Sequence, residues 1–112
     1  MPRASKKVEG EKIQDESTAQ IYSALKSAFP NLPDDPEQVV YRYNPVAIRV
    51  RVISPRFTGK SMAEREEIVS VALDSVPSEI SEDITMQIML SPREAKRPNF
   101  VFLEFDDPDT YQ

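Results

Sequence analysis

The apolar residues of this chain repeat with a period of two in two stretches and with a helical period in two others. Residues 47–54 and 84–90 alternate apolar and polar side chains, which predicts strands. Residues 38–44 are rich in Val and Tyr and predict a further strand. Residues 18–29 and 61–76 instead place apolar side chains three or four positions apart, which predicts amphipathic helices. This order of elements indicates a small α+β domain with a three-stranded sheet and helices packed on one face.

The first two strands are separated only by Pro45 and Val46, which predicts an antiparallel hairpin. The second strand of the hairpin has one apolar and one basic face, with Ile48, Val50 and Val52 on the first and Arg49 and Arg51 on the second. Such alternation is typical of a sheet that helices cover on one face only.

The third strand alternates in the same way. We expect the following inward and outward residues: Ile84, Met86, Ile88 and Leu90 inward, and Thr85, Gln87 and Met89 outward. Thr85 and Gln87 are then expected beside Arg49 and Arg51 on the uncovered face.

Three helix starts carry capping signals. Ser17 or Thr18 is expected to cap the first helix. Ser61 and Glu64 form the pattern of a capping box, in which each side chain accepts a hydrogen bond from the other residue's amide. The stretch 91–94 repeats this pattern with a proline at the first helical position.

The ends of the chain differ from its centre. Residues 1–16 are polar and lack periodicity, which predicts a disordered N-terminal arm before a domain over 17–105. Residues 99–105, NFVFLEF, predict a fourth strand or a packed extended tail, and the alternative is a docking segment for a partner. Residues 106–112 are interpreted as an acidic C-terminal tail.

Composition excludes several classes of function. The 112 residues include no cysteine and no histidine, so zinc, haem and iron–sulfur ligation by this chain is disfavoured and Ser–His and Cys–His catalysis are excluded. No carboxylate pair has a spacing that demands acid–base chemistry, and we expect neither an enzyme nor a bound metal or other cofactor. No apolar stretch approaches the ~20 residues of a membrane helix, so we expect a cytoplasmic protein without a membrane partner.

Charge is segregated along the chain. The formal net charge is −5, yet residues 42–65 hold six basic residues against Glu64 alone. Residues 66–83 hold only acidic charges. An acidic protein can therefore still present one basic surface to nucleic acid.

The stretch SPRFTGKS (54–61) ends like a phosphate-binding loop. A loop of that type needs G-x-x-x-x-G-K-[ST], whose backbone amides surround the phosphate oxygens. Here Ser54 stands at the first glycine, and Pro55 has no amide hydrogen to donate. Half of the motif is missing, which argues against a nucleotide hydrolase.

The same stretch opens a different pattern, F-x-G-K-S-x-x-x-R-x-x-x-V, formed by Phe57, Gly59, Lys60, Ser61, Arg65 and Val69. This pattern resembles the signature of the BolA family, and the order of elements over residues 18–97 agrees with it. The resemblance implies a fold like a class II KH module, with a three-stranded sheet and helices on one face.

The resemblance fails at the positions that would hold a cofactor. It implies a histidine after Arg65, and a second histidine or cysteine between the first two strands, as ligands of a [2Fe–2S] cluster shared with a monothiol glutaredoxin. Glu66 stands at the first position, and the loop is reduced to about residues 44–46. A carboxylate oxygen is a poor substitute for imidazole at such a site.

The resulting hypothesis is a non-enzymatic regulatory or binding module of BolA-like fold. We expect it to contact nucleic-acid phosphates through five basic residues, Arg49, Arg51, Arg56, Lys60 and Arg65. The alternative is a protein-binding adaptor that meets a glutaredoxin-type partner through Phe57 and Gly59 without ligating a cluster.

Overall fold

The computed structural model describes residues 13–96 of the chain. Its elements, in chain order, are α1 (Glu16–Ala28), η2 (Pro36–Gln38), β1 (Val40–Asn44), β2 (Ala47–Ile53), η3 (Pro55–Phe57), α2 (Met62–Ala72), α3 (Ser78–Ser81), β3 (Ile84–Leu90) and α4 (Pro92–Ala95). The elements η2 and η3 are single-turn 3₁₀ helices. The expected strand or tail over 99–105 and the acidic end 106–112 lie outside the described residues, as does most of the expected N-terminal arm.

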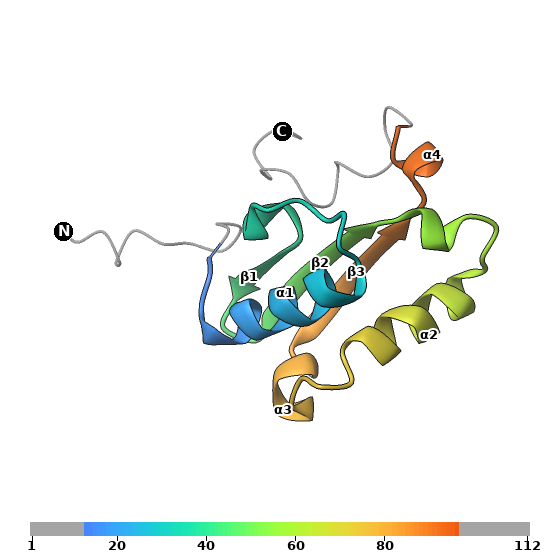
Figure 1. The fold of residues 1–112 in the computed structure, drawn as a ribbon. Coiled ribbons are helices and arrows are strands. Elements are labelled where there is room, and N and C mark those ends of the chain that lie inside the picture. The colour runs from blue at the N-terminus through green and yellow to red at the C-terminus, as the bar shows by residue number, and fades with distance from the viewer. Residues whose placement is uncertain (1–12, 97–112) are drawn as a thin grey trace, which may run out of the picture.

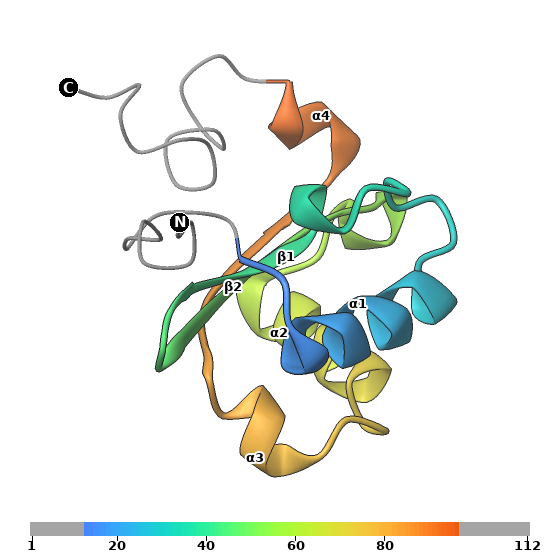
Figure 2. The ribbon, with the colours of Figure 1, turned by 90° about the vertical axis from the view of Figure 1, so that its left-hand side faces the viewer.

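The strands form one sheet in the order β1-β2-β3. β1 and β2 are antiparallel, as the two-residue connection predicts, whereas β2 and β3 are parallel. Figures 1 and 2 show α1 and α2 on the same side of this sheet. The predicted α+β fold, with a three-stranded sheet and its main helices on one face, is therefore confirmed.

The core lies between this face of the sheet and the two long helices. Its fully buried side chains come from α1, both hairpin strands, η3 and α2, and include Ile21, Leu25, Val40, Ile48, Val50, Val52, Phe57 and Val69. The inward face predicted for β2 is thus confirmed. No helix among residues 13–96 is long and apolar enough to cross a membrane.

The expected orientation of β3 is wrong beyond its first residue. Met86 and Ile88 are paired with Arg49 and Arg51, so they lie on the sheet face opposite the helices. Met89 is instead 3% exposed and belongs to the core. A register irregularity between Ile48 and Arg49 of β2 shifts the pairing at this point, which alternation in β3 alone does not reveal.

The first helix also begins earlier than its capping signals suggest. Asp15, not Ser17 or Thr18, is the N-cap, and the Thr18 side chain completes a capping box with it. The Asp15 carboxylate accepts a hydrogen bond from the Thr18 amide at 3.0 Å. Just before this cap, Ile13 pairs with Arg42 of β1 in an isolated antiparallel bridge.

Candidate functional site

The connection between β2 and α2 is a compact turn anchored by one buried ring. Ser54 caps η3 by accepting a hydrogen bond from the Arg56 amide at 3.1 Å. The Phe57 ring is fully buried and lies 5.7 Å from the ring of Phe29 at the end of α1. Phe57 therefore fixes the loop to the core, and its ring offers no surface to a partner protein.

Gly59 and Ser61 determine how the chain enters α2. Gly59 has a φ of 75°, in the left-handed region that glycine adopts without strain. The Ser61 hydroxyl accepts from the Glu64 amide at 3.1 Å, and the Glu64 carboxylate accepts from the Ser61 amide at 2.8 Å. The capping box predicted at this helix is therefore confirmed, as is the one at Ser91 and Glu94.

Arg65 is buried inside the domain, with 7% exposure. Its guanidinium donates to the backbone carbonyls of Lys60 at 3.0 Å and Met89 at 2.8 Å. It also forms two hydrogen bonds with the Glu94 carboxylate, at 2.8 and 3.2 Å. Arg65 thus ties the loop, β3 and α4 together, and a phosphate could reach its guanidinium only by displacing these partners.

The Glu94 carboxylate is strongly acidic in this arrangement. Hydrogen bonds from the Arg65 guanidinium, and then from the Ser91 amide, lower the pKa of Glu94 to about 2. The carboxylate therefore stays ionised, and the bridge between α2 and α4 stays intact, at any pH near neutrality.

Four exposed cations belong to the two segments that follow β2 and β3. Since β2 and β3 are parallel, the loop that follows β2 and the helix that follows β3 leave the sheet at the same end. The loop contributes Arg56 and Lys60, and α4 contributes Arg93 and Lys96. We call these four residues the basic end. Arg93 and Lys96 were not predicted as site residues, because nothing in the local sequence around 91–97 points to residues 56–60.

Arg56 is held in a defined position at the basic end. Its guanidinium donates to the Ala28 carbonyl at 3.1 Å and lies 4.7 Å from the centre of the Phe29 ring. The residue nevertheless remains exposed to solvent. Arg56 can therefore both join η3 to the end of α1 and present charge at the surface.

The two strand arginines lie elsewhere, on the sheet face opposite the helices. Arg49 lies over the ring of Tyr43, with its guanidinium carbon 3.7 Å from the ring centre. Arg51 is 7% exposed, and its guanidinium is 3.3 Å from the Gln38 side-chain oxygen. The five predicted phosphate contacts are therefore divided between this face, the loop and the interior, and do not form one surface.

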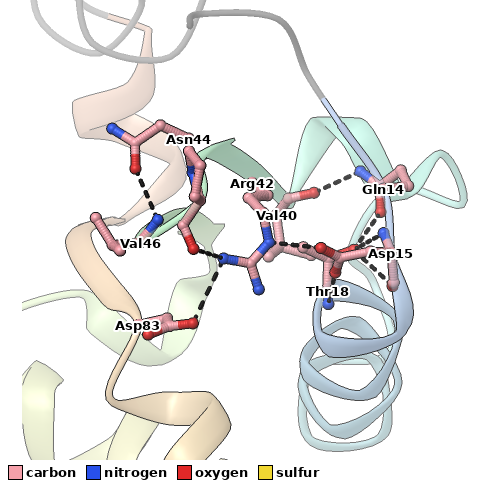
Figure 3. A network of polar contacts seen from close by, with 9 residues as sticks. Gln14, Asp15, Thr18, Val40, Arg42, Asn44, Val46 and Asp83 are labelled. Carbon is pink, nitrogen blue, oxygen red and sulfur yellow. Dashed lines mark hydrogen bonds and ion pairs between the residues drawn. The ribbon is translucent and has the colours of Figure 1, made fainter. Parts of the chain in front are cut away.

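Arg42 joins the N-terminus of α1 to the hairpin and to the start of β3 (Figure 3). Its guanidinium donates to Asp15, to the Pro45 carbonyl at 2.9 Å and to Asp83 at 3.4 Å. Partial burial opposes charge on Asp15, but hydrogen bonds from the Thr18 amide and Arg42 outweigh it and lower the pKa of Asp15. Arg42 is thus engaged in a structural network.

The described residues do not provide the ligands of a metal cluster. Glu66 is exposed on α2, and no group of three potential ligating residues occurs within residues 13–96. The sequence supplies neither the thiolate nor the imidazole that an iron–sulfur cluster requires. The donor set therefore does not fit the cluster that the resemblance to the BolA family implies.

The similarity of this chain to known proteins is low. No family model and no curated protein matches the chain. The structure is similar to the solution structure of BolA1 protein from Mus musculus, with 21% sequence identity and a TM-score of 0.48. This similarity covers 83% of this chain and 81% of that chain.

Proposed function

We propose that this domain is a non-catalytic binding module that contacts the phosphate backbone of nucleic acid through the basic end. The observation that carries the proposal is the gathering of Arg56, Lys60, Arg93 and Lys96 at one end of the sheet. Lysine and arginine side chains that neutralise phosphates supply most of the affinity of non-specific nucleic-acid binding.

The local charge balance supports this assignment. Glu94 is paired with the buried Arg65, so its charge is offset within that bridge. Glu64, in the first turn of α2, is close enough to Lys60 to interact with its charge. The four exposed cations therefore keep a surplus of positive charge over these two carboxylates. An exposed cluster of one sign attracts a polyanion even when the whole chain is acidic.

The sheet lacks the features of a base-reading surface. Tyr41 is 1% exposed, and Arg49 covers the ring of Tyr43. Reading of single-stranded bases usually requires aromatic rings on which bases stack. We therefore expect binding that depends on phosphate charge and shows little sequence preference.

A charge-matched pair of variants tests the proposal. In Lys60→Gln/Lys96→Gln, two positive charges are lost at the basic end. In the control, Ser23→Glu/Ser75→Glu, two negative charges are added at exposed positions on α1 and just after α2. Both changes make the net charge more negative by the same amount, so only the location of the charge differs.

We expect the first variant to bind a short duplex more weakly and with a shallower salt dependence, by about one unit of slope for each lost phosphate contact. The control should retain most of the affinity and the full slope. Equal loss in the two variants would show a net-charge effect and contradict a site at the basic end.

A further inference from the structure

The sheet face opposite the helices is partly shielded from solvent, although α1 and α2 both lie on the other side (Figure 2). The strand pairing and the contact between Arg49 and Tyr43 place eight side chains on it: Tyr41, Tyr43, Arg49, Arg51, Ile53, Met86, Ile88 and Leu90. We call this set the second face. None of the eight is exposed, and Tyr41 and Leu90 are 1% and 6% exposed.

The core beneath the helices does not account for this burial. Tyr41 and Leu90 are absent from the hydrophobic cluster that includes Val40 and Met89, their neighbours in sequence. The face also carries the guanidinium groups of Arg49 and Arg51 beside its apolar side chains. A surface of this kind requires a cover that supplies both apolar and charged groups.

We propose that the second face is the docking site of the chain's own C-terminal segment, residues 99–107. An extended stretch of this segment would place Phe100, Phe102, Glu104 and Asp106 on one side, because successive side chains of an extended chain alternate. The two rings suit the apolar side chains that β3 contributes to the second face. The two carboxylates suit the two arginines that β2 contributes.

The position of the segment in the chain supports this assignment. It follows α4, which begins two residues after β3 ends, so only one short helix separates it in the sequence from the last residue of β3. The seven residues 99–105, when extended, span about 23 Å at 3.3 Å per residue, which is the length of the seven-residue strand β3. The chain is therefore long enough to run back across the whole face.

Charge selects this segment over the N-terminal arm. Residues 98–112 contain four carboxylate side chains and no basic residue, whereas residues 1–12 contain four basic residues against Glu9 and Glu11. A carboxylate that approaches Arg49 and Arg51 gains from opposite charge, while a lysine does not. Docking of the segment removes both arginines from contact with nucleic acid, which leaves the basic end as the available cationic surface.

Methyl NMR on the full chain tests the docking directly. With labelled Met and Ile methyl groups, we expect nuclear Overhauser contacts from the rings of Phe100 and Phe102 to the methyl groups of Met86 and Ile88. Removal of residues 98–112 should shift the Met86 and Ile88 signals and leave the core methyl of Met89 in place, which also shows that the truncated chain is folded. A synthetic peptide of residues 98–112 should restore the original shifts.

A second, charge-matched pair of variants in the peptide tests the role of the carboxylates. Glu104→Gln/Asp106→Asn removes the two charges on the docking side, and Asp107→Asn/Asp109→Asn removes two charges on the other side. The first pair should weaken binding of the peptide to the truncated chain by about three- to tenfold, and the second should change it little.

Three results would overturn the proposal. The first is that residues 1–12, and not the C-terminal segment, contact Met86 and Ile88. The second is that the Met86 and Ile88 signals do not change after truncation. The third is that the two peptide variants weaken binding equally. None of these measurements involves nucleic acid, so their outcome is independent of the function proposed for the basic end.

Discussion

Arg65 connects three segments that are far apart in the sequence. Its hydrogen bonds reach Lys60 in the loop, Met89 in β3 and Glu94 in α4. From the sequence, Arg65 is one more cation in a basic stretch, because burial depends on what packs over a residue and not on its neighbours in the chain. The same reason explains why the burial of Arg51 and Phe57 could not be predicted from their surroundings.

Replacement of Arg65 by methionine should therefore destabilise the domain. The change keeps an unbranched apolar stem, but it removes the donor to the Met89 carbonyl and the cationic partner of the Glu94 carboxylate. We expect a loss of about 2–4 kcal/mol in the free energy of unfolding, measured by chemical denaturation. Lys60→Met, at an exposed position next to the same network, should change it by less than about 0.5 kcal/mol. Similar losses in both variants would contradict a structural role for Arg65.

The free energy of unfolding should also fall at acidic pH, because the Glu94 carboxylate becomes protonated. Its pKa is lowered from 4.5 to about 2 in the folded state, so its contribution is fully present above pH 4.5 and is lost as the pH falls towards 2. Carboxyl NMR titration of Glu94 measures this pKa directly. The Glu94→Gln variant has no carboxyl group at this position, so its free energy of unfolding should fall less between pH 4.5 and 2. A pKa of Glu94 near 4.5 in the folded protein would contradict the bridge to Arg65.

At the scale of elements, the sequence predicts which segments form strands and helices but not how they face one another. The bounds of β2, β3 and α4 and two of the capping boxes agree closely with the periodicity and the Ser-x-x-Glu pattern. The orientation of β3 was predicted wrongly beyond Ile84, because Met86 and Met89 are both apolar and alternation does not say which face the helices cover. Short strands with apolar residues on both faces carry this ambiguity in general.

The turn before α2 depends on the backbone conformation of Gly59. A Cβ at this position would meet no atom within 4 Å, so a substitution is penalised by its positive φ and not by a clash. Gly59→Ala should lower the free energy of unfolding by about 1–2 kcal/mol, and Gly59→Asn should lower it less because asparagine tolerates this region better. Thermal unfolding of the unmodified protein and the two variants measures the order of their stabilities. Equal stability of the Ala and Asn variants would contradict this explanation.

At the scale of the whole molecule, the parallel pairing of β2 and β3 creates the basic end. Because β2 and β3 are adjacent and parallel, the loop with residues 56–60 and the helix with residues 93–96 leave the sheet at the same end. Charge along the sequence predicted Arg56 and Lys60 as candidates, but Arg93 and Lys96 become candidates only once the topology is known. The same topology separates Arg49 and Arg51 from the other predicted contacts, on the second face.

A residue-resolved NMR titration of the full chain with a short mixed-sequence duplex tests the proposed function most directly. At low salt, we expect amide shifts concentrated at residues 56–61 and 93–96, and these shifts should weaken steeply as the salt concentration rises. No shifts at low salt, where contacts with phosphates are strongest, or shifts confined to β1 and β2, would contradict binding at the basic end.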